Sequence, residues 1–130
     1  MSKLKAISPI DGRYQKQTAA LNSYFSEFGL MKYRVLVEIH YFLFLADKDF
    51  FKISPTLKKS LLAVVKNFNE SEAEKIKNIE ATTQHDVKAV EYYLKDILDK
   101  NKASSLKEWI HFGLTSQDIN NTVIHLLVKQ

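Results

Sequence analysis

Apolar residues recur at helical spacing along most of the chain. The clearest stripes are Leu57, Leu61, Val64 and Val65; Val87, Val90, Leu94, Ile97 and Leu98; and Ile119, Val123, Leu126 and Leu127. Repeats at intervals of three and four residues place side chains on one face of a helix, which can then be buried. No segment sustains the alternation that a half-buried strand requires. The pattern therefore predicts an all-α protein with six or seven helices.

Local signals indicate where several helices begin or end. Ser54 followed by Pro55 is typical of a helix start, with serine as N-cap and proline at the first helical position. Residues 69–80 indicate an exposed helix with acidic residues in its first turn, and residues 105–112 indicate a short helix. Gly29 precedes a long apolar segment, where it marks either a break or a close contact between helices.

Residues 30–46 form the most hydrophobic segment of the chain. The side chains that interrupt it are Lys32, Arg34, Glu38 and His40. The segment is also short for a bilayer crossing, and the N-terminus has no apolar run of signal-peptide length. We therefore expect a buried helix, no membrane association and a cytoplasmic location.

Composition narrows the classes of function. With 130 residues and 45% hydrophobic residues, the chain can form one domain with a modest core. The net charge is +4, but only Arg13 and Arg34 are arginines and the lysines are scattered, which disfavours nucleic-acid binding. The absence of cysteine excludes disulfides and cysteine-based metal sites. No histidine lies at metal-ligand spacing from another ligand, so we expect no metal site.

Two polar clusters stand at expected helix starts, Thr82–Asp86 and Thr115–Asp118. The first turn of a helix has backbone N–H groups without intrahelical partners, and the helix dipole makes that end partly positive. Such starts are suited to binding an anion such as a carboxylate or a phosphate. The alternative at the second cluster is ordinary capping, with Thr115 or Ser116 as N-cap and Asp118 completing a box. Both interpretations hold if one hydroxyl caps the helix and the other faces a ligand.

Two further candidates are His85 with Asp86, and Arg13 with Tyr14. Adjacent helical residues point about 100° apart, so His85 and Asp86 are suited to sharing a ligand. Alternatively, Asp86 is a favourable first-turn acid and His85 a solvated side chain. Arg13 follows a Pro-Ile-Asp-Gly turn, where it could bind a phosphate or carboxylate with help from Tyr14. The alternative for Arg13 is a surface salt bridge.

Three stretches together resemble one family: "SPIDGRY" at residues 8–14, "TTQHDVKAVEYYLK" at 82–95 and "EWIHFGLTSQDINN" at 108–121. In order and spacing they are similar to the N-terminal region of the adenylosuccinate lyase family, a branch of the fumarase/aspartase superfamily. "TSQDINN" separates this family from argininosuccinate lyase and fumarase. Gln84 is a departure, because Asn is more usual there before the His-Asp pair.

The resemblance implies an all-α fold in which an N-terminal helical domain, residues 1–112, leads into a central helical bundle that begins at residues 113–130. It implies a cytoplasmic homotetramer of purine biosynthesis. Such an enzyme splits adenylosuccinate into AMP and fumarate by β-elimination, and acts likewise on the analogous succinyl-carboxamide ribotide. The implied partner is a substrate that joins a nucleotide to a dicarboxylate, with no metal or organic cofactor.

The resemblance also implies which side chains contact the substrate: Arg13, Tyr14, Gln84, His85, Asp86, Thr115 and Ser116. The first two match a loop at the nucleotide phosphate, and the next three match a substrate-contacting stretch in which the histidine assists charge placement. The last two match the pair that holds a succinyl or fumarate carboxylate. The family's general-acid histidine and general-base serine lie further along the chain, and its active sites combine three subunits. We therefore expect no catalytic residue and no turnover in these 130 residues alone.

Other interpretations stay open on the residues alone. The sequence ends inside a periodic helical segment without a stop signal, which indicates a longer chain or a fraying terminal helix. A stand-alone helical interaction module would offer the apolar face of residues 30–46 to a partner protein. Another lyase of the superfamily would share the fold, but "TSQDINN" disfavours it.

Overall fold

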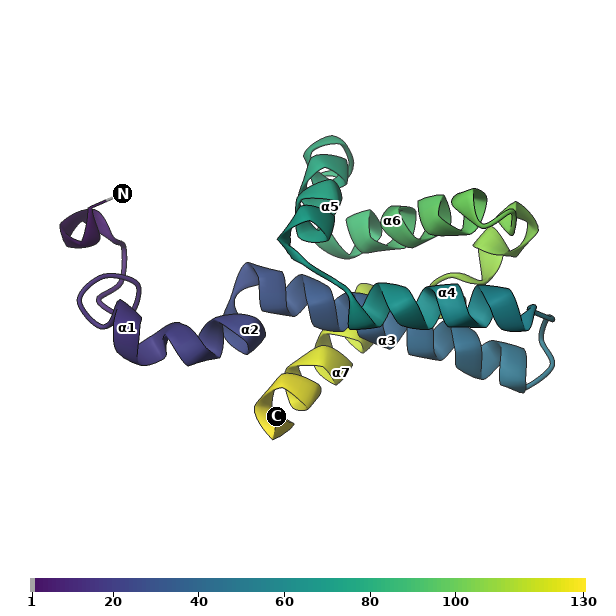
Figure 1. The fold of residues 1–130 in the computed structure, drawn as a ribbon, viewed down its shortest axis with the longest axis horizontal. Helices are drawn as coiled ribbons and strands as arrows, with labels where there is room; N and C mark the ends of the chain where they lie inside the picture. Colours follow the sequence, from purple (N-terminus) through teal and green to yellow (C-terminus); the bar gives the residue numbers. More distant parts are fainter. Residues whose placement is uncertain (1) are drawn as a thin grey trace.

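The computed structural model describes residues 2–130 (Figure 1). Its helices, with η denoting a 3-10 helix, are η1 (Lys3–Lys5), α1 (Gln15–Thr18), η2 (Ala19–Leu21), α2 (Asn22–Phe25), α3 (Glu27–Asp47), α4 (Pro55–Lys66), α5 (Glu70–Thr83), α6 (Asp86–Lys100), η3 (Ser104–Trp109) and α7 (Ser116–Lys129). No strand occurs within residues 2–130, so the all-α prediction is confirmed over that range.

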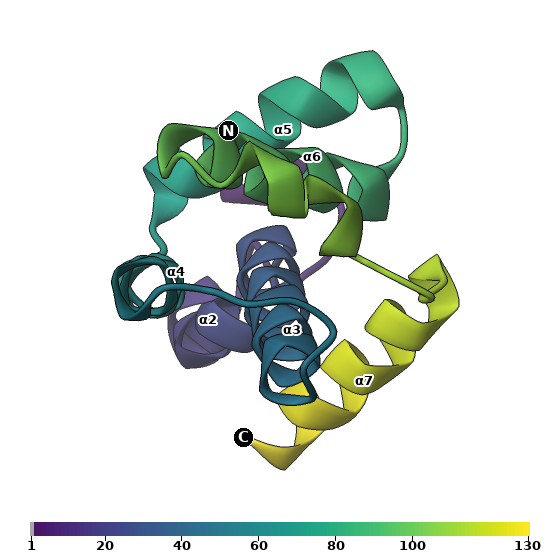
Figure 2. The same cartoon turned by 90° about the vertical axis from the view of Figure 1, so that its right-hand side faces the viewer.

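The long helix α3 forms the centre of the body (Figures 1 and 2). Helix α4 runs back alongside it, α5 and α6 cover one side, and α7 crosses the opposite side. Helices α5 and α6 also pack on each other. Because α3 contacts all four of these helices, residues far apart in the sequence meet on its surface.

The predicted apolar stripes form two cores. The main core is built on α3, α4, α5 and α6, and its most deeply buried side chains include Ile39, Phe42, Leu61, Ile76, Leu94 and Leu98. A smaller cluster joins α3 to the beginning of α6 and one face of α7, and consists of Tyr33, Val87, Ile119, Val123 and Leu127. Burying one large aliphatic side chain contributes on the order of 1.5–3 kcal/mol. The smaller cluster therefore holds the starts of α6 and α7 beside α3.

The apolar segment 30–46 lies inside α3 and is covered by the chain itself. The apolar side chains on it that are at most 4% exposed are Met31, Val35, Ile39, Phe42 and Leu45. The face that a stand-alone interaction module would present to a partner is thus already buried, so the structure does not favour that alternative. No helix within residues 2–130 combines the length and the hydrophobicity that a bilayer crossing requires.

The structure confirms one of the local signals and decides between the two interpretations of another. Ser54 caps α4, and its Oγ accepts a hydrogen bond from the Leu57 amide at 3.1 Å, which confirms the prediction. Gly29 makes a close contact and not a break, because a Cβ there would lie 2.7 Å from the Tyr24 carbonyl oxygen. The backbone of α2 can approach α3 this closely only beside a glycine.

The segment expected as a short helix at residues 105–112 differs from the prediction. It is the 3-10 helix Ser104–Trp109, and the chain is extended at Ile110. Trp109 stacks on Phe51 with ring centroids 5.2 Å apart, and Ile110 is buried in the main core.

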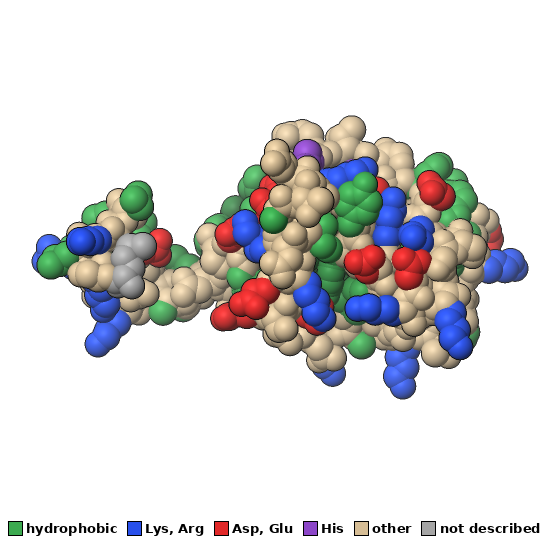
Figure 3. Space-filling view, turned by 90° about the horizontal axis from the view of Figure 1, so that it is seen from above, with side chains coloured by type: hydrophobic (Ala, Val, Ile, Leu, Met, Phe, Trp, Pro, Cys, Tyr) green, Lys and Arg blue, Asp and Glu red, His purple; other side chains and the backbone are tan. Residues whose placement is uncertain are grey.

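Residues 3–18 form an arm that projects from the body (Figures 1 and 3). Its turn is self-contained, with the Tyr14 amide donating to the Pro9 carbonyl at 2.9 Å. A Cβ at Gly12 would lie 2.6 Å from the Lys3 carbonyl oxygen, so the turn requires glycine at this position. Figure 3 also shows basic and acidic side chains interspersed over one face of the body.

Candidate functional site

A tight corner joins α5 to α6, with only Gln84 and His85 between the two helices. Gln84 has a φ of 54°, the left-handed conformation that commonly ends a helix, and its amide donates to the Glu80 carbonyl at 2.7 Å. This conformation is uncommon for a residue other than glycine or asparagine. It reverses the chain sharply, so that His85 becomes the N-cap of α6.

The His85 ring is held by the helix that it caps. Its Nδ1 accepts a hydrogen bond from the Lys88 amide at 3.2 Å, which places the proton of the neutral ring on Nε2. The side chain is 52% exposed, so this N–H can donate to a ligand. Nδ1 lies 3.9 Å from Asp86 Oδ1, too far for a hydrogen bond between the two neighbours.

Asp86 is fixed between a backbone amide and a buried arginine. Its Oδ1 accepts a hydrogen bond from the Val87 amide at 2.8 Å, and its Oδ2 lies 2.9 Å from Arg34 Nη2. Burial raises the pKa of the Asp86 carboxyl, but the Val87 amide and the Arg34 guanidinium together hold it below its ordinary value. Asp86 is therefore ionised at neutral pH, and both of its oxygens are engaged within the protein.

The start of α7 is a complete capping box. Thr115 Oγ1 accepts from the Asp118 amide at 3.3 Å and donates to Asp118 Oδ2 at 3.1 Å, while that oxygen accepts from the Thr115 amide at 2.9 Å. The Thr115 amide is the first cause of the lowered pKa of the Asp118 carboxyl. Thr115 is thus the capping hydroxyl. Ser116, the first helical residue, is half-buried, and its hydroxyl has no hydrogen bond to any of residues 2–130.

Arg34 connects the two helix starts. Besides Asp86, its guanidinium contacts Asn120 Oδ1 in α7, through Nε at 3.1 Å and Nη2 at 2.9 Å. The Arg34 side chain is only 6% exposed. In the sequence, Arg34 stands out only as an interruption of an apolar segment, and Asn120 carries no local signal. The signal that could have found Arg34 is a charge on a buried helix, since a buried charge requires partners.

Arg13 and Tyr14 lie on the arm, apart from the two helix starts (Figure 1). The Arg13 guanidinium carbon is 5.3 Å from the centroid of the Tyr14 ring. Arg13 forms no ion pair with a carboxylate of residues 2–130, so the surface salt bridge does not explain it. Within one chain, therefore, the structure brings together the residues around Asp86 and Ser116 but does not bring Arg13 and Tyr14 to them.

A second buried charge lies one turn further along α3. Glu38 is fully buried, and its Oε1 bonds His111 Nδ1 in the loop before α7, while its Oε2 has no partner among residues 2–130. Burial raises the pKa of the Glu38 carboxyl, although its contact with His111 opposes the shift. His111 has a φ of 59°, a strained conformation for this residue type. The pair fixes the loop that leads to Thr115, and no local sequence pattern predicts it.

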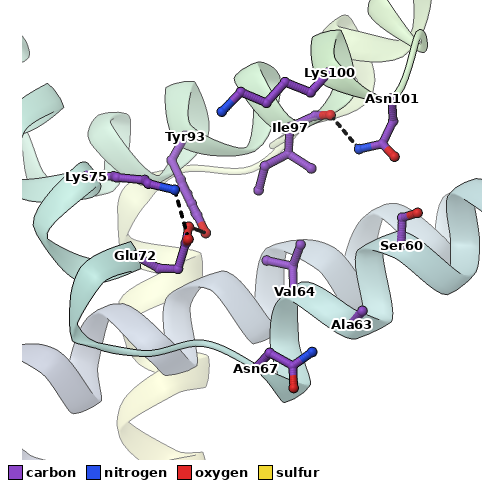
Figure 4. Close-up of a pocket in the computed structure, with 10 residues that line it drawn as sticks. All are labelled: Ser60, Ala63, Val64, Asn67, Glu72, Lys75, Tyr93, Ile97, Lys100 and Asn101. Carbon is purple, nitrogen blue, oxygen red and sulfur yellow. Dashed lines mark hydrogen bonds and ion pairs between the residues drawn. The ribbon is translucent and has the colours of Figure 1, made fainter.

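A hollow of about 360 Å³ opens between α4, α5 and α6 (Figure 4). Its only carboxylate, on Glu72, is already satisfied by the Tyr93 hydroxyl at 2.6 Å and the Lys75 ammonium at 2.9 Å. None of the site residues predicted from the sequence lines this hollow. Within residues 2–130, no three His, Asp or Glu side chains come together as a metal site would require. The hollow is therefore separate from the predicted site, and its lining contains the part-buried hydrogen bond between Tyr93 and Glu72.

Replacing Tyr93 with phenylalanine is expected to lower the free energy of unfolding by about 1–2 kcal/mol at pH 7, because the buried hydroxyl donates to a charged group. Burial and the Glu72 contact raise the pKa of Tyr93 above its ordinary value of about 10. The stabilisation is therefore fully present below pH 10 and is lost as the pH rises through the folded-state pKa. Urea unfolding of both proteins at pH 7 and pH 11 should show the difference narrowing at pH 11; a constant difference would contradict the assignment.

Three side-chain donors among the site residues predicted at the two helix starts have no acceptor within residues 2–130. They are the Nε2–H of His85, the side-chain amide of Gln84 and the hydroxyl of Ser116, none of which donates to another of residues 2–130. Both carboxylate oxygens of Asp86, and Oδ2 of Asp118, already accept from internal donors. The arrangement can therefore donate hydrogen bonds to an anion rich in oxygen, such as a carboxylate.

Comparisons with known proteins identify the family to which the chain belongs. The adenylosuccinate lyase of Legionella pneumophila (strain Corby) is 53% identical over 135 residues, which cover 100% of this chain and 30% of the relative. The adenylosuccinate lyases of Dictyostelium discoideum and Escherichia coli (strain K12) are 49% and 43% identical, over 100% and 99% of this chain. The chain spans about 30% of the length of these relatives. A family model described as "Lyase" matches residues 12–130, and the chain therefore belongs to the lyase family.

Proposed function

We propose that this chain is the N-terminal, substrate-binding part of an adenylosuccinate lyase. The complete protein would eliminate fumarate from adenylosuccinate, giving AMP, and from succinyl-aminoimidazole-carboxamide ribotide. The observation that carries the proposal is that Arg34 joins the starts of α6 and α7. The free hydrogen-bond donors at these two helix starts suit a substrate that bears carboxylates. Identity of 43–53% to enzymes of this name, over nearly all of the chain, supports it.

The start of α7 would hold a carboxylate of the succinyl group. Ser116 would donate its free hydroxyl to the carboxylate, and the exposed amides of the first turn would add partial positive charge. Thr115 would serve the same site by fixing the turn through its capping box. A carboxylate held in this way can accept the charge that develops when a proton leaves the neighbouring carbon.

The start of α6 would contact the same substrate. His85 would donate from Nε2, because Nδ1 is occupied by the Lys88 amide. Gln84 would add its amide from the corner, and Asp86 would orient the corner through its contact with Arg34. These roles are binding and charge placement. The general acid and the general base would come from residues outside this chain.

Arg13 and Tyr14 would contact the nucleotide phosphate from the arm. Since the arm lies apart from the helix starts of its own chain, we assign this contact to a site completed by another subunit of a homotetramer. A guanidinium free of carboxylate partners is suited to a phosphate. Residues 1–112 would form the N-terminal domain, and residues 113–130 would begin the first helix of the central bundle.

The test of the proposed function is turnover. The complete protein is expected to release fumarate from adenylosuccinate and not from argininosuccinate, whereas the 130-residue chain alone should release none, because it lacks the acid and the base. Fumarate formation can be followed by its ultraviolet absorbance. Cleavage by the isolated chain, or preference of the complete protein for argininosuccinate, would contradict the proposal.

A further inference from the structure

Arg34 occupies an unusual place for a charged residue. It lies on the central helix α3, its side chain is 6% exposed, and its partners come from two other helices. Burying an unpaired guanidinium would be strongly unfavourable, so the side chain is stable there only because Asp86 and Asn120 receive its hydrogen bonds.

The geometry of the guanidinium constrains both partners at once. Nη2 lies 2.9 Å from Asp86 Oδ2 and 2.9 Å from Asn120 Oδ1, and Nε lies 3.1 Å from the same Asn120 oxygen. Because the guanidinium is planar and rigid, these three contacts fix where the first turn of α6 stands relative to α7. A lysine ammonium on its flexible stem has no such fork.

The apolar cluster beneath the site holds the three helices together but does not fix their precise positions. Tyr33, Val87 and Ile119 bury the same junction of α3, α6 and α7, but apolar contact is not directional. We expect this cluster to keep the three helices together if Arg34 is replaced. The distance between the two helix starts would then be less well defined, while the fold would persist.

We infer that Arg34 is a positioning residue that sets the distance between the Ser116 hydroxyl and the His85 imidazole. It acts through Asp86, which neighbours His85, and through Asn120, one turn beyond Ser116, and it does not touch the substrate. The inference rests on the proposed function, in which these two donors grip one substrate. Misplacement of binding groups by even 1 Å is enough to reduce a rate by about a hundredfold.

The test uses Arg34→Lys and Arg34→Met in the complete protein, with kcat/KM for adenylosuccinate and the thermal unfolding midpoint as readouts. Both variants are expected to lose about tenfold to a hundredfold in kcat/KM. Lysine should not rescue activity, although it keeps the charge. Tyr93→Phe is the matched control, because it removes a buried hydrogen bond of the body and should leave kcat/KM within about twofold.

A variant at Asn120 tests the inference even if the Arg34 variants fail to fold. Asn120→Ala removes one acceptor but leaves the buried Arg34 guanidinium paired with Asp86, and it should lower kcat/KM severalfold. Combined with Arg34→Lys it should add little, because both changes break the same clamp. Wild-type kcat/KM in Arg34→Lys, or fully additive losses in the double variant, would overturn the inference.

Amide hydrogen exchange separates failure of this inference from failure of the proposed function. Arg34→Met should speed exchange at residues 86–89 and 116–119 and leave α4 unchanged. Absence of turnover in the unmodified protein would contradict the proposed function, and exchange would still decide whether Arg34 acts as a clamp. Unchanged exchange at both helix starts would overturn the clamp itself.

Discussion

Replacing Ser116 with alanine is expected to lower kcat/KM of the complete protein for adenylosuccinate by about tenfold to a hundredfold. The Ser116 hydroxyl has no hydrogen-bond partner within residues 2–130, so the folded protein loses no internal contact when it is removed. A hydrogen bond to a charged carboxylate contributes about 1.5–3 kcal/mol, which is the basis of the expected loss. The thermal unfolding midpoint should change by no more than about 1 °C.

Thr115→Ala is the matched control, one residue away. It destroys the capping box and should lower the free energy of unfolding by about 1 kcal/mol. If Ser116→Ala reduced only the unfolding midpoint and left kcat/KM intact, the start of α7 would be a structural cap without a role in binding.

Replacing His85 with asparagine is the second substitution with a large expected effect. Asparagine is among the best N-cap residues, so it can replace the contact between His85 Nδ1 and the Lys88 amide. It cannot replace the Nε2–H, which lies on the far side of the ring. We expect kcat/KM to fall about tenfold or more while the thermal unfolding midpoint stays equal or rises.

His85→Ala completes the comparison, because it removes both the cap and the donor. It should lose stability as well as activity, with a kcat/KM close to that of the asparagine variant. Full activity in His85→Asn would show that His85 acts only as a cap, and the start of α6 would then have no donor role in the proposed site.

The features predicted correctly from the sequence are those that depend on near neighbours. The Ser54 cap of α4, and the capping of α7 by one of Thr115 and Ser116, each involve residues within one helical turn, so their chemistry is readable along the chain. The identity of the free hydroxyl was not readable in the same way. Both Thr115 and Ser116 could have capped α7, and the structure assigns that role to Thr115.

The features missed from the sequence are contacts between distant segments. Arg34 and Glu38 were grouped with Lys32 and His40 as interruptions of an apolar segment, yet only Arg34 and Glu38 are buried and paired. Their spacing of four residues places them on one face of α3, and this is the signal that could have separated them. Their partners in α6, α7 and the loop before α7 could not be found without the tertiary fold.

The position of the arm relative to the helix starts also could not be predicted from the sequence. The turn around Gly12 follows local rules, but nothing near Arg13 indicates whether it meets the helix starts. The structure places the arm apart from them in a single chain (Figure 1). Local chemistry can thus nominate Arg13 as an anion-binding residue, while the partner that completes its site depends on assembly.

The most direct measurement is a crystal structure of the complete protein with AMP and fumarate bound. Our account predicts a fumarate carboxylate within about 3 Å of Ser116 Oγ, and His85 Nε2 within hydrogen-bond distance of the same bound products. The Arg34 contacts to Asp86 and Asn120 should be unchanged. Products bound elsewhere, with neither Ser116 nor His85 in contact, would contradict the claim that the two helix starts form one site.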